Sequence, residues 1–132
     1  MASASVIFEG KNNTVLLQLR DNKTNNYPEM WGLFGGTIEN NETPIQAAVR
    51  EMKEELGIDL QEKNLKLFLN IKNGNEEYYI FRSKFIWNIK DIELKEGKDM
   101  KFFSKKEFLK LNNIIPPVKK NFGKYVKKNK LI

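Results

Sequence analysis

The alternation of apolar and polar positions predicts a chain built mainly from short β-strands. Six segments have the length and the β-branched or aromatic content of strands, and they cover residues 3–9, 14–20, 31–38, 65–71, 78–87 and 100–103. The turn residues Gly10 to Asn13 separate the first two segments, which should therefore form a hairpin. Residues 21–29 are polar and contain Tyr27-Pro28, a composition that predicts a loop.

A helix is predicted over residues 44–56. Thr43 can cap its N-terminus, with Pro44 at the first helical position and Gln46 at the third, which is a capping-box arrangement. Gly57 is placed to end the helix. Apolar residues recur between these ends at three- and four-residue spacing: Ile45, Ala48, Val49, Met52 and Leu56. We expect this apolar stripe to pack against the sheet.

Two further helices are predicted towards the C-terminus. Residues 105–111 indicate a brief helix, and Pro116-Pro117 opens a basic helix over about 117–128. Its apolar positions are Val118, Phe122, Tyr125 and Val126. No repeat or linker interrupts the chain, so we expect one domain over residues 1–132. The predicted fold class is α/β, a sandwich in which one helix follows the third strand of a mixed sheet and another ends the chain.

The composition excludes several kinds of chemistry. The sequence has no Cys and no His, so it offers no thiolate, no imidazole base and none of the commonest transition-metal ligands. Catalysis would have to use carboxylates, Lys, Arg, Tyr or hydroxyl groups with metals that prefer oxygen. The N-terminus lacks the basic and apolar regions of a signal peptide, and no stretch approaches a membrane span. We therefore expect a cytoplasmic protein.

The net charge of +6 is unevenly distributed. Residues 98–132 carry eleven Lys and two acidic residues, whereas residues 1–97 carry twelve Lys or Arg and fifteen acidic residues. A basic surface of this kind could gather phosphorylated substrates or nucleic acid. We favour the alternative of a solvated face, because no aromatic ladder interleaves these lysines. Nucleic acid is accordingly not an expected partner.

Three glutamates cluster near the end of the 44–56 helix. Glu51, Glu54 and Glu55 have i, i+3 and i+4 spacing and would fall within an arc of about 100°, opposite much of the apolar stripe. Arg50 is four residues from Glu54 and can pair with it. The cluster could be a solvated face, but like charges at these spacings and acids in a last helical turn are both destabilising. A bound cation would explain them, and carboxylates without His or Cys suit Mg²⁺ or Mn²⁺.

The spacing of the whole segment resembles the Nudix box of the Nudix hydrolases. The matching residues run without a gap from Gly36 to Ile58, and the similarity extends back to Trp31. The identities that carry it are Gly36, Glu42, Arg50, Glu51, Glu54, Glu55 and Gly57. The resemblance implies an α/β/α sandwich and Mg²⁺-dependent hydrolysis of a nucleoside diphosphate linked to another group. A small nucleotide would be the substrate, and the protein would be a monomer or homodimer.

The resemblance also assigns roles to residues of this chain. Glu51, Glu54 and Glu55 would be the metal-binding and catalytic set, and Arg50 would orient them through ion pairs. A backbone carbonyl of Gly35 or Gly36 would be a further metal ligand. Glu42 would have a structural role in the turn before the helix. Glu96, in a region where relatives often supply another acid, is either a ligand or a solvated loop residue, and Glu51 is our first choice of general base.

Substrate choice depends on residues outside the box. Pro116-Pro117 resembles a segment of MutT-type relatives that cleave nucleoside triphosphates, but Lys119 stands where those acting on oxidised guanine have Asn. Arg20, Phe34 and Lys119 are candidate substrate contacts, although for Arg20 we favour the alternative of an exposed strand end. Aromatic residues that could stack on a base or pack in the core are Tyr27, Trp31, Tyr79 and Phe81.

The leading hypothesis is a (d)NTP pyrophosphohydrolase that releases a nucleoside monophosphate and pyrophosphate. One alternative is hydrolysis of a nucleotide sugar or a dinucleotide-type diphosphate. Another, from a different class, is a protein with the same fold that binds nucleotide or RNA without turnover. The intact glutamates weigh against this last alternative.

Overall fold

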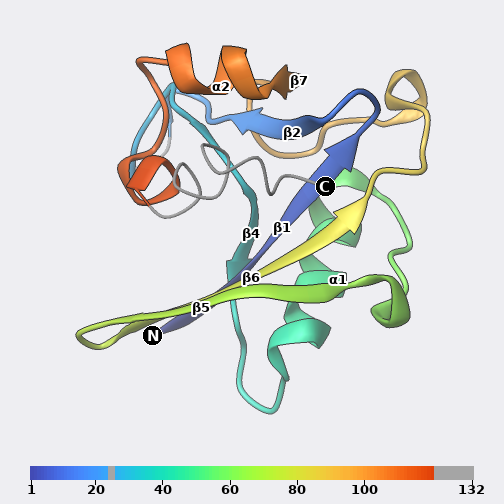
Figure 1. Ribbon diagram of the computed structural model, residues 1–132. Coiled ribbons are helices and arrows are strands. Elements are labelled where there is room, and N and C mark those ends of the chain that lie inside the picture. The colour runs from blue at the N-terminus through green and yellow to red at the C-terminus, as the bar shows by residue number, and fades with distance from the viewer. Residues whose placement is uncertain (24–25, 121–132) are drawn as a thin grey trace.

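A computed structural model describes residues 1–23 and 26–120 (Figure 1). The strands in this part of the chain are β1 (Ala2–Gly10), β2 (Thr14–Leu19), β3 (Trp31–Gly32), β4 (Phe34–Thr37), β5 (Lys66–Asn73), β6 (Glu76–Lys84) and β7 (Asp99–Ser104). The helices are α1 (Pro44–Leu56) and α2 (Lys105–Lys110), with 3₁₀ turns η1 (Glu62–Asn64) and η2 (Ile89–Asp91). Each predicted strand segment therefore contains a strand.

The strands form one mixed sheet, as predicted. Its order is β3-β2-β1-β6-β5, with β4 also paired to β1 and β7 also paired to β2. β1 and β6 run parallel, in a register that sets Ser3 beside Tyr78 and Glu9 beside Lys84. The other strand pairings are antiparallel, including the predicted β1–β2 hairpin. The parallel pair places residues of distant parts of the sequence side by side at each end of the sheet.

The glycine-rich segment differs from its prediction. Residues 31–38 were expected to form one strand, but β3 pairs with β2 and β4 pairs with β1. Helix α1 consequently follows the fourth strand rather than the third. Gly35 lies so close to β1 that a Cβ atom there would overlap the Ala4 carbonyl oxygen. Only glycine permits this approach, which brings β4 against the centre of the sheet.

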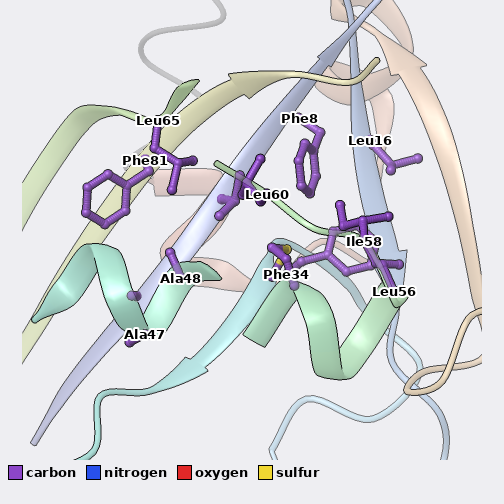
Figure 2. Close-up of a cluster of buried hydrophobic side chains, with 13 residues drawn as sticks. Phe8, Leu16, Phe34, Ala47, Ala48, Leu56, Ile58, Leu60, Leu65 and Phe81 are labelled. Carbon is purple, nitrogen blue, oxygen red and sulfur yellow. The ribbon is translucent and has the colours of Figure 1, made fainter. Parts of the chain in front are cut away.

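Helix α1 begins and ends as predicted. The Thr43 hydroxyl accepts a hydrogen bond from the Gln46 backbone amide, and the Gln46 side chain accepts one from the Thr43 amide. Gly57 ends the helix in the left-handed conformation, with φ of 69°. The apolar stripe of α1 packs against β1 and β4 in a core that includes Phe8 and Phe34 (Figure 2).

The opposite face of the sheet carries a second core. Ile7, Leu17 and Phe103 from the strands pack there with Phe108 of α2 and with Ile114. Helices thus cover both faces of the sheet in the described part of the chain, which confirms the sandwich. Residues 116–120 are helical, whereas the rest of the predicted helix over about 117–128 lies outside the described residues. Within residues 1–23 and 26–120, no helix is long and apolar enough to cross a membrane.

Candidate active site

The three glutamates of α1 differ sharply in exposure. The side chain of Glu54 is 52% exposed, that of Glu51 is 12% exposed, and Glu55 is buried with 1% of its surface accessible. Their predicted common position opposite the apolar stripe is therefore wrong for Glu55. This residue follows Met52 by three positions, so its side chain lies on the edge of the buried face.

Arg50 connects the acidic residues of this region. Its Nε and Nη2 atoms donate to the two carboxylate oxygens of Glu42 at 2.7 and 3.0 Å. Nη2 also donates to the Thr37 carbonyl oxygen at 2.9 Å, and Nη1 lies 3.2 Å from oxygens of both Glu51 and Glu54. The hydrogen bond with Arg50 holds the pKa of Glu42 below its usual range. Arg50 therefore ties the turn before α1 to the glutamates on the helix.

Substituting Arg50 with Lys is expected to loosen this arrangement. A single ammonium group cannot reproduce the fork that holds Glu42 while it reaches Thr37 and Glu51. We expect the free energy of unfolding to fall by about 2–3 kcal/mol. The hydrolysis that the Nudix-box resemblance implies should slow by about tenfold or more, because the glutamates lose their orientation. Urea unfolding and steady-state kinetics would measure the two effects. Lys53→Gln, on an exposed position of the same helix, is the control.

Strand β4 contacts the glutamates through its glycines. A Cβ atom at Gly36 would overlap the carboxylate of Glu51. The backbone amide of Gly35 donates a hydrogen bond to Glu55. Because Gly36 has no side chain, the Glu51 carboxylate can occupy the space beside it. The backbone carbonyls of Gly35 and Gly36 are candidate metal ligands.

Glu55 is an acid in an environment that opposes its ionisation. Burial, together with the nearby charges of Glu51 and Glu96, raises the pKa of Glu55 to about 9, although the Gly35 amide acts in the opposite direction. Burial also raises the pKa of Glu51, as do the charges of Glu54 and Glu96, against the lowering effect of Arg50. Oε2 of Glu55 is buried and has no hydrogen-bond partner in the part of the chain that the structure describes.

These observations fit a divalent cation. The unpartnered oxygen of Glu55 and the mutual repulsion of Glu51, Glu55 and Glu96 would both be relieved by positive charge between them. Oxygen ligands of this kind match Mg²⁺ or Mn²⁺. Among the described residues no three acidic side chains are placed to hold a metal ion as they stand, and Glu51 and Glu54 are held by Arg50. Some rearrangement of these two carboxylates would accompany binding.

The raised pKa of Glu55 predicts how the metal-free protein responds to pH. The folded state retains a proton that the unfolded chain releases near the ordinary pKa of about 4.5. Stability should therefore decrease as the pH rises from about 4.5 to about 9. Thermal unfolding in EDTA over this range would measure the decrease, and saturating Mg²⁺ should reduce it. A flat profile that Glu55→Gln does not alter would contradict the assignment.

A pocket of about 390 Å³ adjoins β4 on the face of the sheet away from α1. Its walls come from several elements and include Ser3, Arg20, Tyr27, Gly36, Tyr78 and Val118. Arg20, directly after β2, lines this pocket, and its Nε donates to the Asn26 carbonyl oxygen at 2.9 Å. We call this space the Tyr78 pocket. It shares Gly36 with the glutamate site, so a molecule could contact both.

Other predicted substrate contacts are placed elsewhere. Phe34 is fully buried in the core beneath α1, with its ring against that of Phe8. Its side chain is inaccessible, which corrects its prediction as a substrate contact. Lys119 is exposed and does not line the Tyr78 pocket. Glu96 is exposed, near enough for its charge to act on Glu51 and Glu55, and its carbonyl oxygen accepts a hydrogen bond from Gln18.

Among the aromatic candidates, only Tyr27 faces the pocket. Trp31 packs edge-on against Phe103, whereas Tyr79 and Phe81 contribute to the core on the α1 side. Tyr78 was not singled out from the sequence. Its place in the pocket depends on the parallel pairing of β6 with β1. No local pattern in the sequence predicts this pairing. The alternation along β6 could only have shown that Tyr78 and Tyr79 point to opposite faces.

The sequence matches the NUDIX domain family over residues 1–122. The chain belongs to the Nudix family. It is 36% identical to the dihydroneopterin triphosphate diphosphatase of Haemophilus influenzae, over 64% of this chain and 51% of that protein. It is 35% identical to the ADP-ribose pyrophosphatase of Methanocaldococcus jannaschii, over 79% of this chain and 59% of that protein. This Nudix chain therefore spans about half to three fifths of the length of these curated relatives.

Solved structures agree with the family assignment. A NUDIX hydrolase from Nitrosomonas europaea has a TM-score of 0.80 at 25% identity, over 98% of this chain and 71% of that chain. The Nudix box, from Gly36 to Ile58, contributes the end of β4, helix α1 and the turns around it.

Proposed function

We propose that the protein hydrolyses a phosphoanhydride bond in a nucleoside diphosphate linked to a further group, with Mg²⁺ or Mn²⁺ as cofactor. The observation that carries the proposal is the buried carboxylate of Glu55, whose Oε2 is unpartnered among the described residues and whose neighbours include Glu51 and Glu96. The stability of the helix does not require this arrangement, because burying a carboxyl oxygen without a hydrogen-bond partner is destabilising. It becomes favourable when the site holds a cation.

The residues divide into two groups by what they would do. Glu51, Glu54 and Glu55, with a carbonyl oxygen of Gly35 or Gly36 and with Glu96, would hold the metal. Arg50 would keep Glu51 and Glu54 oriented. When bound, the metal would neutralise phosphate oxygens and lower the pKa of a coordinated water. We assign proton acceptance from the attacking water to Glu51, whose carboxylate lies between Arg50 and Gly36.

We further propose a nucleoside triphosphate as substrate, cleaved to the monophosphate and pyrophosphate. The Tyr78 pocket supports this choice, because Tyr27 and Tyr78 offer aromatic faces and Arg20 offers a cation beside the glycines of β4. Its volume of about 390 Å³ is within the range of small-molecule sites. The relative from H. influenzae is named for a triphosphate substrate.

A second candidate substrate is a nucleoside diphosphate linked to a sugar, such as ADP-ribose. The relative from M. jannaschii favours this candidate, because its name specifies ADP-ribose. Its match covers more of this chain than the match to the relative from H. influenzae. The two candidates differ in their products. A nucleoside triphosphate would release pyrophosphate, whereas ADP-ribose would release AMP and a sugar phosphate.

A substrate panel tests the proposal. Purified protein with Mg²⁺ would be offered NTPs, dNTPs, oxidised dNTPs, ADP-ribose, nucleotide sugars and dinucleoside polyphosphates, with products separated by chromatography. We expect the largest kcat/KM for a triphosphate and a raised KM in Tyr78→Ala. Release of product from none of these compounds would refute the hydrolase proposal. Tight RNA binding with a steep salt dependence would then favour a non-catalytic role.

A further inference from the structure

A second pocket lies at the other end of the parallel strands. Its volume is about 580 Å³, and it is formed by the ends of β1 and β6, the start of β5 and the segment around η1. Side chains on its walls include Lys63, Lys66, Arg82, Lys84, Ile86 and Trp87. We call it the basic pocket. Within the described part of the chain, no lysine between residues 98 and 120 lines it.

The charge of the basic pocket is largely uncompensated. Glu9 lines it too, but Glu9 is buried and its carboxylate is held by Nη2 of Arg82 at 2.8 Å. Lys63, Lys66 and Lys84 are exposed, and none of the three forms an ion pair with another described residue. The ion pair with Glu9 fixes the guanidinium of Arg82 between the surrounding lysines.

The sheet register brings like charges together at this pocket. Lys66 on β5 is the direct cross-strand partner of Arg82 on β6. Like charges at directly opposed positions are destabilising. Lys84 lies two residues after Arg82 on the same face of β6, where its partner on β1 is Glu9. An anion bound among these groups would convert the repulsion into attraction, as phosphate does with Arg and Lys clusters.

An apolar wall stands beside the cations. Ile86 is 73% exposed, and Trp87 and Leu60 also line the pocket. Trp87 is anchored by edge-on contacts with Phe8 and Phe85, so its ring has a fixed position. A ligand that carries both a phosphate group and a flat apolar part could contact the cationic side chains and the apolar side chains at the same time. The volume is adequate for a molecule the size of a nucleotide.

The basic pocket is separate from the glutamate site. The Tyr78 pocket uses Ser3 on β1 and Tyr78 on β6, whereas the basic pocket uses Glu9 and Lys84, six residues further along the same strands. At about 3.3 Å per residue the two positions are roughly 20 Å apart. The two pockets share no wall residue, and their nearest walls on β6 are Ile80 and Arg82. We propose that the basic pocket is a second binding site, for a phosphorylated small molecule of nucleotide size, independent of the hydrolysis proposed above.

The test is a titration of ¹⁵N-labelled protein with AMP in EDTA, followed by NMR. We expect amide shifts concentrated at residues 63–66 and 82–87. The double variant Lys66→Gln/Lys84→Gln should weaken AMP binding at these positions by about tenfold or more, because two charge-assisted contacts are lost. Inorganic pyrophosphate should cause shifts at the same residues, and Ile86→Ser should weaken binding of AMP but not of pyrophosphate.

The matched control is Lys72→Gln/Lys110→Gln, which removes the same charge at two exposed positions outside the basic pocket. It should change AMP affinity less than twofold. Equal weakening in both double variants would overturn the proposal, because the effect would then follow net charge. AMP shifts confined to the Tyr78 pocket would also overturn it. If the Lys66/Lys84 variant failed to fold, Lys63→Gln in the exposed η1 turn would provide the same comparison.

Discussion

Replacing Glu55 with Gln should lower kcat by about 10²- to 10⁴-fold while the protein remains folded. Gln preserves the shape of the side chain but cannot supply a negative charge to a cation. Because burial raises the pKa of Glu55 to about 9, the metal-free protein already carries a neutral group here near pH 7. The thermal midpoint in EDTA at pH 7 should accordingly change little.

Two measurements separate a metal-binding role from a structural one. Mg²⁺ should raise the thermal midpoint of the wild-type protein, because a ligand that binds only the folded state stabilises it. That increase should be lost in Glu55→Gln and retained in Glu62→Gln, an exposed acid of η1. Wild-type turnover in Glu55→Gln would remove Glu55 from the site. Loss of folding in EDTA would instead assign it a structural role.

Gly36→Ala is expected to lower activity by about a hundredfold or more with little effect on stability. The added Cβ atom would overlap the Glu51 carboxylate, which is the end of a flexible side chain and can swing away. Gly36 has no left-handed backbone conformation that would oppose alanine. The substitution should therefore displace a functional group while the strand stays in place. Steady-state kinetics and urea unfolding would measure the two quantities.

A double-mutant cycle provides the control for Gly36. If the substitution acts by displacing Glu51, then Gly36→Ala should have little further effect on activity in a Glu51→Ala background. Two losses that simply add would show that Gly36 acts in another way, for example through its carbonyl oxygen. Lys53→Gln, at an exposed position of α1 outside the pocket, should leave turnover within a fewfold of the wild-type value.

Local signals in the sequence predicted local structure well. The capping residues Thr43 and Gln46 and the terminating Gly57 placed α1 at its observed bounds, because each acts within one helical turn. The pairing of Arg50 with Glu54 followed from i, i+4 spacing and is present. The strands were placed to within a few residues by alternation of apolar and polar positions.

The burial of side chains and the formation of pockets depend on distant residues, and they were not predicted from the sequence. Glu55 was grouped with Glu51 and Glu54 by helical spacing, but its burial is decided by how closely α1 approaches β4. Phe34 was assigned by analogy to substrate, yet the pleat of β4 directs it into the core. Both pockets depend on the parallel pairing of β1 with β6, which joins segments more than seventy residues apart. Sequence periodicity contains no information about such a partner.

The contacts of Arg50 have a consequence for how readily the site exchanges its ion. The guanidinium already contacts Glu51 and Glu54, so an incoming cation has to compete with an internal one for the same oxygens. This competition weakens the net affinity for the cation, and Arg50 also reduces the repulsion among the carboxylates. With an internal counterion of this kind, we expect the metal site to exchange Mg²⁺ readily. The fraction of protein with bound Mg²⁺ should then follow the free Mg²⁺ concentration.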